Sequence, residues 1–193
     1  MPRPKEFDRS KVVQRAMDVF WQQGYETTSI NDLTKATKLK PGSLYNTFGS
    51  KHAIYLEALD HYLAHVGSDI FTVLDAPISG LTAIEICFDG LITLELSDPL
   101  QRGCFMQNAI MDRSAHDPDV HKRACKSETE GIGAFRRALE RAQNNGEVRQ
   151  DIDLDDTARY LVSIIYAVRT MARTSRIRSD LETVVQIALS TLT

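Results

Sequence analysis

Two stretches near the N-terminus decide the fold of this chain: GYETTSINDL at residues 24–33 and LKPGSLYNTFGSK at residues 39–51. Ser29 is a predicted helix N-cap, because its hydroxyl can accept from free backbone N–H groups. Pro41 suits the first position of a second short helix. The positions predicted to face a core are Ile30, Leu33, Leu44 and Phe48. Each stretch therefore predicts one short helix with one apolar face.

A longer helix is expected before these two, and another one after them. Apolar spacing predicts the first over about residues 11–23, with Asp8 as its N-cap and Gly24 at its C-terminal end. Ser50 is placed to cap the helix that follows. Three helices within about 50 residues, two of them short, favour a helix-turn-helix, a scaffold that presents one helix to a DNA major groove ~12 Å wide.

The rest of the chain also predicts helices, at about residues 80–97, 101–113, 117–145, 155–173 and 178–192. Turn signals separate them, and alternation typical of strands is nearly absent. Residues 157–171 and 181–192 are apolar around more than one face. Because little chain remains to cover both, a second copy is the expected cover. The expected fold class is all-α.

Charge is distributed unevenly along the chain. Its 193 residues carry a net charge of −3, whereas residues 1–51 hold nine Lys or Arg and five Asp or Glu, a net +4. The remainder therefore carries −7. A basic head on an acidic body favours contact of the head alone with a polyanion.

Composition excludes several classes of protein. No apolar run approaches the ~18 residues of a membrane span, and the N-terminus lacks a secretory signal, so a cytoplasmic protein without membrane contact is expected. The three cysteines, in no CxxC spacing, argue against a disulfide framework and a zinc finger: Cys87, Cys104 and Cys125.

No motif for catalysis stands in the chain. It has no Gly-rich phosphate loop, no HExxH and no GxSxG, so neither an enzyme nor a cofactor is expected. Two alternatives stay open at this point. One is a helical enzyme with scattered catalytic residues, and the other is an architectural DNA-binding dimer that has no effector.

The two quoted stretches closely resemble the DNA-binding domain of the TetR family of bacterial regulators, over about residues 10–58. The Gly-aromatic, Thr-Ser, Asp, Gly, Leu-Tyr, Phe and Ser-Lys positions stand in register. The resemblance implies a helix-turn-helix domain over residues 1–51 and an effector-binding and dimerisation domain over residues 52–193. It further implies a homodimer on a palindromic double-stranded operator, a ligand-responsive regulator, and repression rather than activation.

The resemblance assigns roles to individual residues. Thr28 and Ser29 would bind phosphates at a helix N-terminus, and Gly42 would allow close approach to DNA. Tyr45 and Lys51 would each contact a phosphate. The groove-facing positions would be Lys40, Pro41, Ser43, Asn46 and Thr47.

Some positions depart from the family pattern. Lys38 stands where glycine best tolerates left-handed backbone, at a cost of ~1 kcal/mol, and Lys38 with Lys40 would offset this through added phosphate contacts. Arg3 and Lys5 form either an arm that reaches a minor groove or a solvated tail.

The resemblance also implies that the last two long helices form the dimer seam and that the C-terminal helices enclose a ligand pocket. Expected lining residues, each with ordinary core as its alternative, are Phe88, Cys104, Phe105, Met106, Ile110 and Tyr166. Cys104 would be either a reactive thiol or an inert buried one. Solvated surface is the interpretation for His61, His65, His116, Asp117, Asp119, His121, Glu128 and Glu130, so no metal site is expected.

Overall fold

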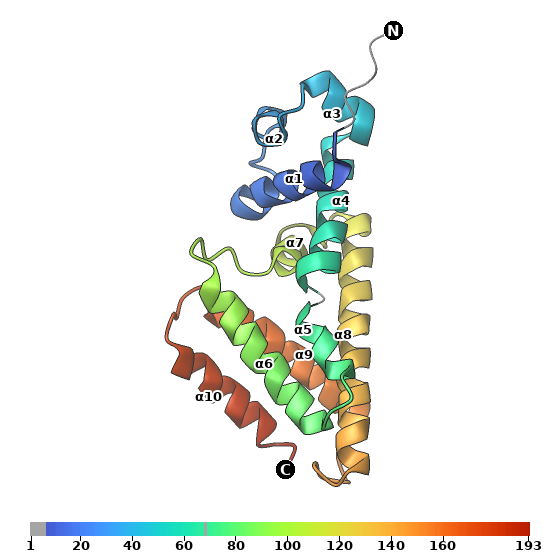
Figure 1. The fold of residues 1–193 in the computed structure, drawn as a ribbon, viewed down its shortest axis with the longest axis vertical. Helices are drawn as coiled ribbons and strands as arrows, with labels where there is room; N and C mark the ends of the chain where they lie inside the picture. Colours follow the sequence, from blue (N-terminus) through green and yellow to red (C-terminus); the bar gives the residue numbers. More distant parts are fainter. Residues whose placement is uncertain (1–6, 68) are drawn as a thin grey trace. The chain divides into compact units, whose positions relative to one another are not determined.

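The computed structural model describes residues 7–67 and 69–193, and its regular elements there are helices throughout (Figure 1). The all-α prediction is confirmed. The chain forms two compact units, Met1–Val66 and Gly67–Thr193. None of the helices in the described ranges is long and apolar enough to cross a lipid bilayer.

The first unit consists of α1 (Arg9–Gln23), α2 (Ile30–Thr37), α3 (Pro41–Phe48) and α4 (Lys51–Tyr62). We expected the units to divide after residue 51, whereas the structure divides them after Val66. The reason is that α4 packs on α1, with the rings of Phe20 and Tyr55 5.1 Å apart. The apolar side of α4 thus completes the core of the first unit.

Local signals set the ends of these helices. Asp8 accepts from the Lys11 amide at 3.2 Å and caps α1, and Gly24, at φ 82°, ends it. Lys38 has φ 62° after α2, which confirms the predicted left-handed turn. The expected helix starts at the Ser29 cap and at Pro41 are confirmed as well.

The second unit contains α5 (Asp69–Thr72), the 3-10 turn Val73–Asp75, α6 (Gly80–Ser97), α7 (Phe105–Arg113), α8 (Pro118–Asn144), α9 (Leu154–Met171) and α10 (Arg178–Leu189). A short π-helical segment, Leu63–Gly67, follows α4 and ends on the first residue of the second unit. The long helix α8 packs along α6 and α9, and α10 packs on α6 and α9 (Figure 1).

One helix in the second unit begins later than the sequence predicts. The expected start was near residue 101, but α7 begins at Phe105. Gln101 and Gly103 have φ of 52° and 67°, in the left-handed region that a right-handed helix excludes. The preceding residues therefore form a turn, whose carbonyl at Arg102 accepts from the Asn108 side chain at 2.9 Å.

Candidate nucleic-acid interface and ligand cavity

The short helix α3 has a buried side and a polar side. Leu44 and Phe48 are buried in the first unit, whereas Tyr45 is 45% exposed. The exposed residues of the helix are Pro41, Gly42, Ser43, Tyr45 and Asn46. Since two buried anchors four residues apart fix the orientation of the helix, the other side is held out as a rigid surface.

The remaining predicted positions around α3 differ in their exposure and in their hydrogen bonds. Thr47 is half-buried, and its hydroxyl donates to the Ser43 carbonyl at 2.7 Å. Lys40 precedes the helix without a side-chain capping bond, and both Lys38 and Lys40 are exposed. A Cβ built on Gly42 would meet nothing within 4 Å, so the fold itself does not require glycine there.

Ser29 and Thr28 stand at the start of α2 but differ in exposure. Ser29 is exposed, and its hydroxyl accepts from the Asp32 amide at 3.1 Å. It also donates to the Asp32 carboxylate, which holds the pKa of that carboxyl below its ordinary value. Thr28 is 1% exposed and donates to the Gly24 carbonyl at 2.6 Å. Because that hydroxyl is buried, Thr28 does not suit the phosphate contact we expected and instead holds the turn.

Two basic side chains brace the interface. The ammonium of Lys51 lies 4.3 Å from the centroid of the Tyr25 ring and donates to the Glu26 carbonyl at 3.4 Å. Arg9 was not among the expected residues. It donates to both oxygens of Glu57, at 2.6 and 3.2 Å, and to the Thr47 carbonyl at 3.3 Å.

Arg9 therefore ties α1 to α4 and to the last turn of α3. Its guanidinium also lies 4.6 Å from the centroid of the Phe48 ring. No motif in the sequence marks these partners, because they lie 38 and 48 residues away. Arg3 and Lys5, the expected arm, lie outside the described residues.

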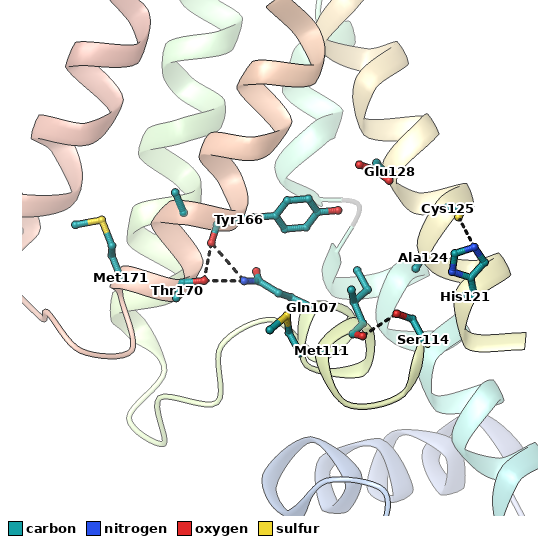
Figure 2. A pocket seen from close by; sticks show the side chains of 12 residues that line it. Gln107, Met111, Ser114, His121, Ala124, Cys125, Glu128, Tyr166, Thr170 and Met171 are labelled. Carbon is teal, nitrogen blue, oxygen red and sulfur yellow. Dashed lines mark hydrogen bonds between the residues drawn. The ribbon is translucent and has the colours of Figure 1, made fainter. Parts of the chain in front are cut away.

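The second unit contains a cavity of about 670 Å³ between α7, α8 and α9 (Figure 2). Its walls are mostly apolar, with a few polar groups among them, as is usual for a small-molecule site. The lining residues are Gln107, Ile110, Met111, Ser114, His121, Ala124, Cys125, Glu128, Tyr166, Ala167, Thr170 and Met171.

Two of the six expected lining residues, Ile110 and Tyr166, line this cavity. The other four are buried and lie elsewhere. Phe88 packs in the core with Phe135 at 5.7 Å between ring centroids. Cys104 caps α7, accepting from the Gln107 amide at 3.4 Å. Phe105 and Met106 are 2% and 4% exposed.

Helical periodicity could have identified the remaining lining residues. On α8 they are His121, Ala124, Cys125 and Glu128, spaced i, i+3, i+4 and i+7. The lining residues of α7 and of its C-cap repeat this spacing: Gln107, Ile110, Met111 and Ser114. We had interpreted His121 and Glu128 as solvated surface. They are exposed, but they also form one side of the cavity.

The polar groups of the cavity are partly fixed by the fold. The side-chain amide nitrogen of Gln107 donates to the Thr170 hydroxyl at 2.8 Å and to the Tyr166 carbonyl at 3.3 Å. Its oxygen Oε1 is buried without a hydrogen-bond partner among the described residues. Burial, with a further contribution from Glu128, raises the pKa of the Tyr166 hydroxyl, which therefore stays protonated.

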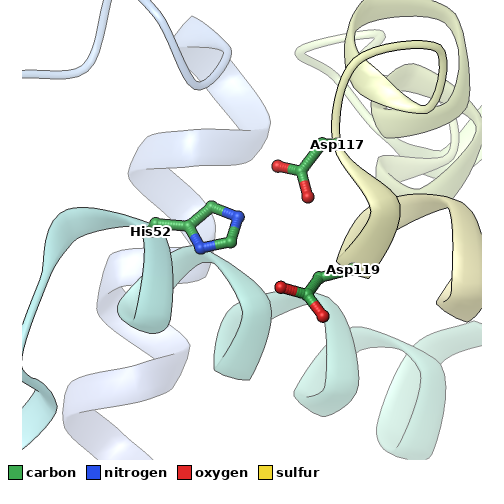
Figure 3. A group of neighbouring side chains, drawn as sticks. All are labelled: His52, Asp117 and Asp119. Atoms are coloured by element: carbon green, nitrogen blue, oxygen red, sulfur yellow. The ribbon is translucent and has the colours of Figure 1, made fainter.

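The histidine and aspartate residues near the start of α8 have local roles. Asp117 accepts from the Val120 amide at 3.2 Å and pairs with Arg113 at 3.2 Å, so it is a helix cap. Asp119 follows in the first turn (Figure 3). Cys125 Sγ lies 3.5 Å from His121 Nε2, and both are side chains that can bind a metal ion. A structural zinc ion takes four ligands, so these two side chains alone do not form such a site.

A buried ion pair connects α6 and α9. Arg169 Nε lies 3.4 Å from Glu95 Oε1, and both side chains are less than a tenth exposed. Arg169 also donates to Cys104 Sγ at 3.1 Å. Burial raises the pKa of the Glu95 carboxyl, and the Arg169 charge opposes that rise. This network joins α6, α9 and the N-terminus of α7.

Comparison with protein families gives two matches. Residues 12–58 match the model described as bacterial regulatory proteins, tetR family. Residues 80–188 match the model described as tetracyclin repressor-like, C-terminal domain.

Individual proteins similar to this chain span its full length. It is 32% identical to the uncharacterized HTH-type transcriptional regulator YezE of Bacillus subtilis, covering 100% of both chains. It is 31% identical to the HTH-type transcriptional repressor ComR of Escherichia coli, over 98% of this chain and 90% of that one. A cysteine mutant of the TetR family transcriptional regulator CifR, solved with 26 bp of double-strand operator DNA, matches with a TM-score of 0.85, at 33% identity and 100% coverage of both chains.

Proposed function

Because the chain belongs to the TetR family of bacterial transcriptional regulators, we propose that it is a ligand-responsive repressor that binds a palindromic operator as a homodimer. As a family member it is a DNA-binding regulator and not an enzyme. The observation that carries the proposal is the polar, exposed side of α3, held in place by the buried Leu44 and Phe48.

The proposed DNA contacts fall into two classes. Tyr45, Lys38, Lys40, Lys51 and the α2 N-terminus at Ser29 contact phosphates, which fix the register without reading sequence. The remaining positions of the α3 surface face the bases: Gly42 allows close approach of the DNA, and base edges are read by Pro41, Ser43, Asn46 and Thr47. Arg9 acts through α3, because it anchors the carbonyl of Thr47 to α4.

The proposed dimer seam is formed by α9 and α10. Both helices carry large apolar side chains that the monomer leaves exposed, Tyr160 at 39% and Ile187 at 64%. Pairing α9 and α10 with the same helices of a second copy gives a two-fold axis. Two recognition helices then meet two half-sites one DNA turn (~34 Å) or a multiple of it apart.

The cavity is the proposed effector site. The helix α9 contributes both to the cavity, through Tyr166 and Thr170, and to the proposed seam, through Tyr160. A ligand that fits one arrangement of α9 better than another therefore shifts the population of dimers that match the operator. Release of DNA follows because the spacing of the two recognition helices no longer suits successive grooves.

Selection of bound duplexes from a random DNA pool, at ~0.15 M salt to suppress non-specific binding, tests the proposal. Enrichment of a palindrome supports a symmetric, sequence-specific regulator and supplies the probe for ligand release. Binding without an enriched motif indicates an architectural DNA-binding protein. Absence of binding to any duplex argues against the proposal.

Replacing Tyr45 or Asn46 is expected to separate affinity from specificity. Tyr45→Phe removes a phosphate contact and should weaken binding to every duplex by about tenfold. Asn46→Ala should instead reduce about tenfold the ratio between the affinity for the operator and the affinity for single-base variants of it. Titration of both variants against the operator and its variants measures this. Equal losses on all duplexes from both substitutions would contradict the assigned roles.

Gly42→Ala is expected to weaken operator binding without cost to the fold. The added Cβ meets nothing within 4 Å in the protein, and alanine favours a helix over glycine by about 0.5–1 kcal/mol. The thermal midpoint should stay equal or rise, whereas operator affinity should fall about tenfold because the methyl group blocks close approach of DNA. Unchanged affinity would show that Gly42 does not lie against the duplex.

A further inference from the structure

We propose that the cavity between α7, α8 and α9 selects an apolar organic cation with N–H donors, such as a protonated amine on an aromatic or alkyl body. The inference rests on the proposed function, since it names the chemical class of the effector for that same site. Three observations carry it: an unpaired acceptor, an aromatic ring with a carboxylate, and walls without lysine or arginine.

The unpaired acceptor is the side-chain oxygen of Gln107. The amide nitrogen is held by two bonds, to the Thr170 hydroxyl at 2.8 Å and the Tyr166 carbonyl at 3.3 Å, and a flip of the amide would set its oxygen against the carbonyl, where neither can donate. The oxygen is thereby fixed, buried and without a partner among the described residues. A buried acceptor without a partner costs about 1–3 kcal/mol, so a ligand whose N–H displaces the neighbouring atoms and reaches this oxygen gains that free energy.

The second observation is an aromatic ring beside a carboxylate. Tyr166 extends from α9 toward α8, where Glu128 lies (Figure 2), and both line the cavity. The Glu128 charge raises the pKa of the Tyr166 hydroxyl and the Arg169 charge lowers it, but of these two side chains Glu128 lines the cavity and Arg169 does not. A tyrosine face and a carboxylate both attract a cation, and the attraction to the ring strengthens as water is excluded.

The third observation concerns the charges that the cavity lacks. No lysine or arginine lines it within the described part of the chain. His121 is the basic side chain in the lining, and its Nε2 contacts Cys125 Sγ. Arg169, on the same helix as Tyr166, is buried against Glu95 and does not line the cavity. A carboxylate or phosphate ligand would therefore lose its hydration without gaining a counter-charge.

The rest of the wall suits an apolar body. Ile110 and Ala124 contribute aliphatic surface, and two methionines, Met111 from α7 and Met171 from α9, also line the cavity (Figure 2). Methionine adapts to irregular shapes because it is unbranched and flexible. At about 670 Å³ the cavity lies in the range of drug-sized ligand sites.

Three probes with one skeleton test the charge preference: phenylbutylamine, phenylbutanol and phenylbutyrate. Calorimetric titration into the full-length protein at neutral pH should show the amine binding at least about fivefold more tightly than the alcohol, and the carboxylate most weakly. Glu128→Gln should remove the advantage of the amine and leave the alcohol unchanged. Glu130→Gln, on the same helix but outside the lining, is the matched control.

Protection of the Cys125 thiol from modification tests whether the probes bind in this cavity. It is the exposed cysteine of the lining, whereas Cys87 and Cys104 are buried. The amine should slow modification of Cys125 by a maleimide, a readout that does not depend on DNA.

Equal affinity for amine and alcohol, tighter binding of the carboxylate, an unchanged Glu128→Gln variant, or no binding of any probe would each overturn the inference. Failure of the proposed function is distinguishable, because it appears separately as absence of operator binding in the selection experiment.

Discussion

Ile187→Asp is expected to abolish dimerisation and with it operator binding. Ile187 is 64% exposed in the single chain, so the substitution removes little packing within the monomer. In the proposed seam of α9 and α10 the same position is covered by a second copy, where an unpaired carboxylate costs several kcal/mol. Since a monomer engages one half-site alone, operator affinity should fall at least about 100-fold.

Two measurements check this result together. Analytical ultracentrifugation should show a monomer, and circular dichroism should show an unchanged helical content. Ile86→Asp is the matched control, because Ile86 is also exposed, at 47%, but lies on α6 outside the proposed seam. A dimeric Ile187→Asp variant, or a control that dissociates equally, would place the dimer interface elsewhere on the second unit.

The DNA-reading unit was predicted closely because its signals are local. Ser29 caps α2 through an atom three residues away, and Pro41 starts α3 by its fixed φ. The left-handed turn at Lys38 was expected from the family pattern and not from its neighbours. Thr28 is the exception, since the burial of its hydroxyl depends on how α1 and α2 pack and not on the sequence around it.

The cavity could be predicted only in part because it lies between three separate helices, and their packing against one another is not visible in the sequence. Ile110 and Tyr166 were found as apolar or aromatic residues on bundle helices. Phe88 and Met106 have the same character but are buried away from the cavity. Periodicity shows that a helix has an inner face, but the register between helices decides whether that face meets a neighbour or a cavity.

Glu128 is a polar residue whose place in the cavity lining could not be identified from the sequence either. An exposed glutamate in a helix with many charges indicates solvated surface, and nothing near it in sequence contradicts that interpretation. Its role as a lining residue emerges only when α9 brings Tyr166 next to α8. Polar residues that line an open cavity are therefore the hardest class to identify from sequence alone.

Gly80→Ala is expected to lower the free energy of unfolding of the second unit by about 3 kcal/mol. A Cβ at Gly80 would lie 2.1 Å from the Ala138 carbonyl oxygen and 2.6 Å from the Ala142 amide nitrogen, both backbone atoms of α8. Because backbone cannot rotate away as a side chain does, α6 and α8 must separate, and overpacking of this kind typically costs about 1–3 kcal/mol.

The Gly80→Ala substitution should also weaken a second set of hydrogen bonds, which hold the start of α6. Glu147 accepts from the Ser79 hydroxyl at 2.8 Å and from the Leu81 amide at 3.1 Å, and these contacts hold its pKa below the ordinary value. Moving α6 away from α8 weakens both, which places the expected cost at the upper end of the range. Urea denaturation measures it as a lower midpoint with an unchanged slope.

Gly90→Ala is the matched control, since Gly90 lies in the same helix and its Cβ would meet nothing within 4 Å. Alanine favours the helix there, so this variant should gain about 0.5–1 kcal/mol. Opposite signs at Gly80 and Gly90 would show that the close approach of α8, and not helix propensity, requires glycine at the start of α6. Equal stabilisation by both substitutions would mean that α6 and α8 are not in close contact at Gly80.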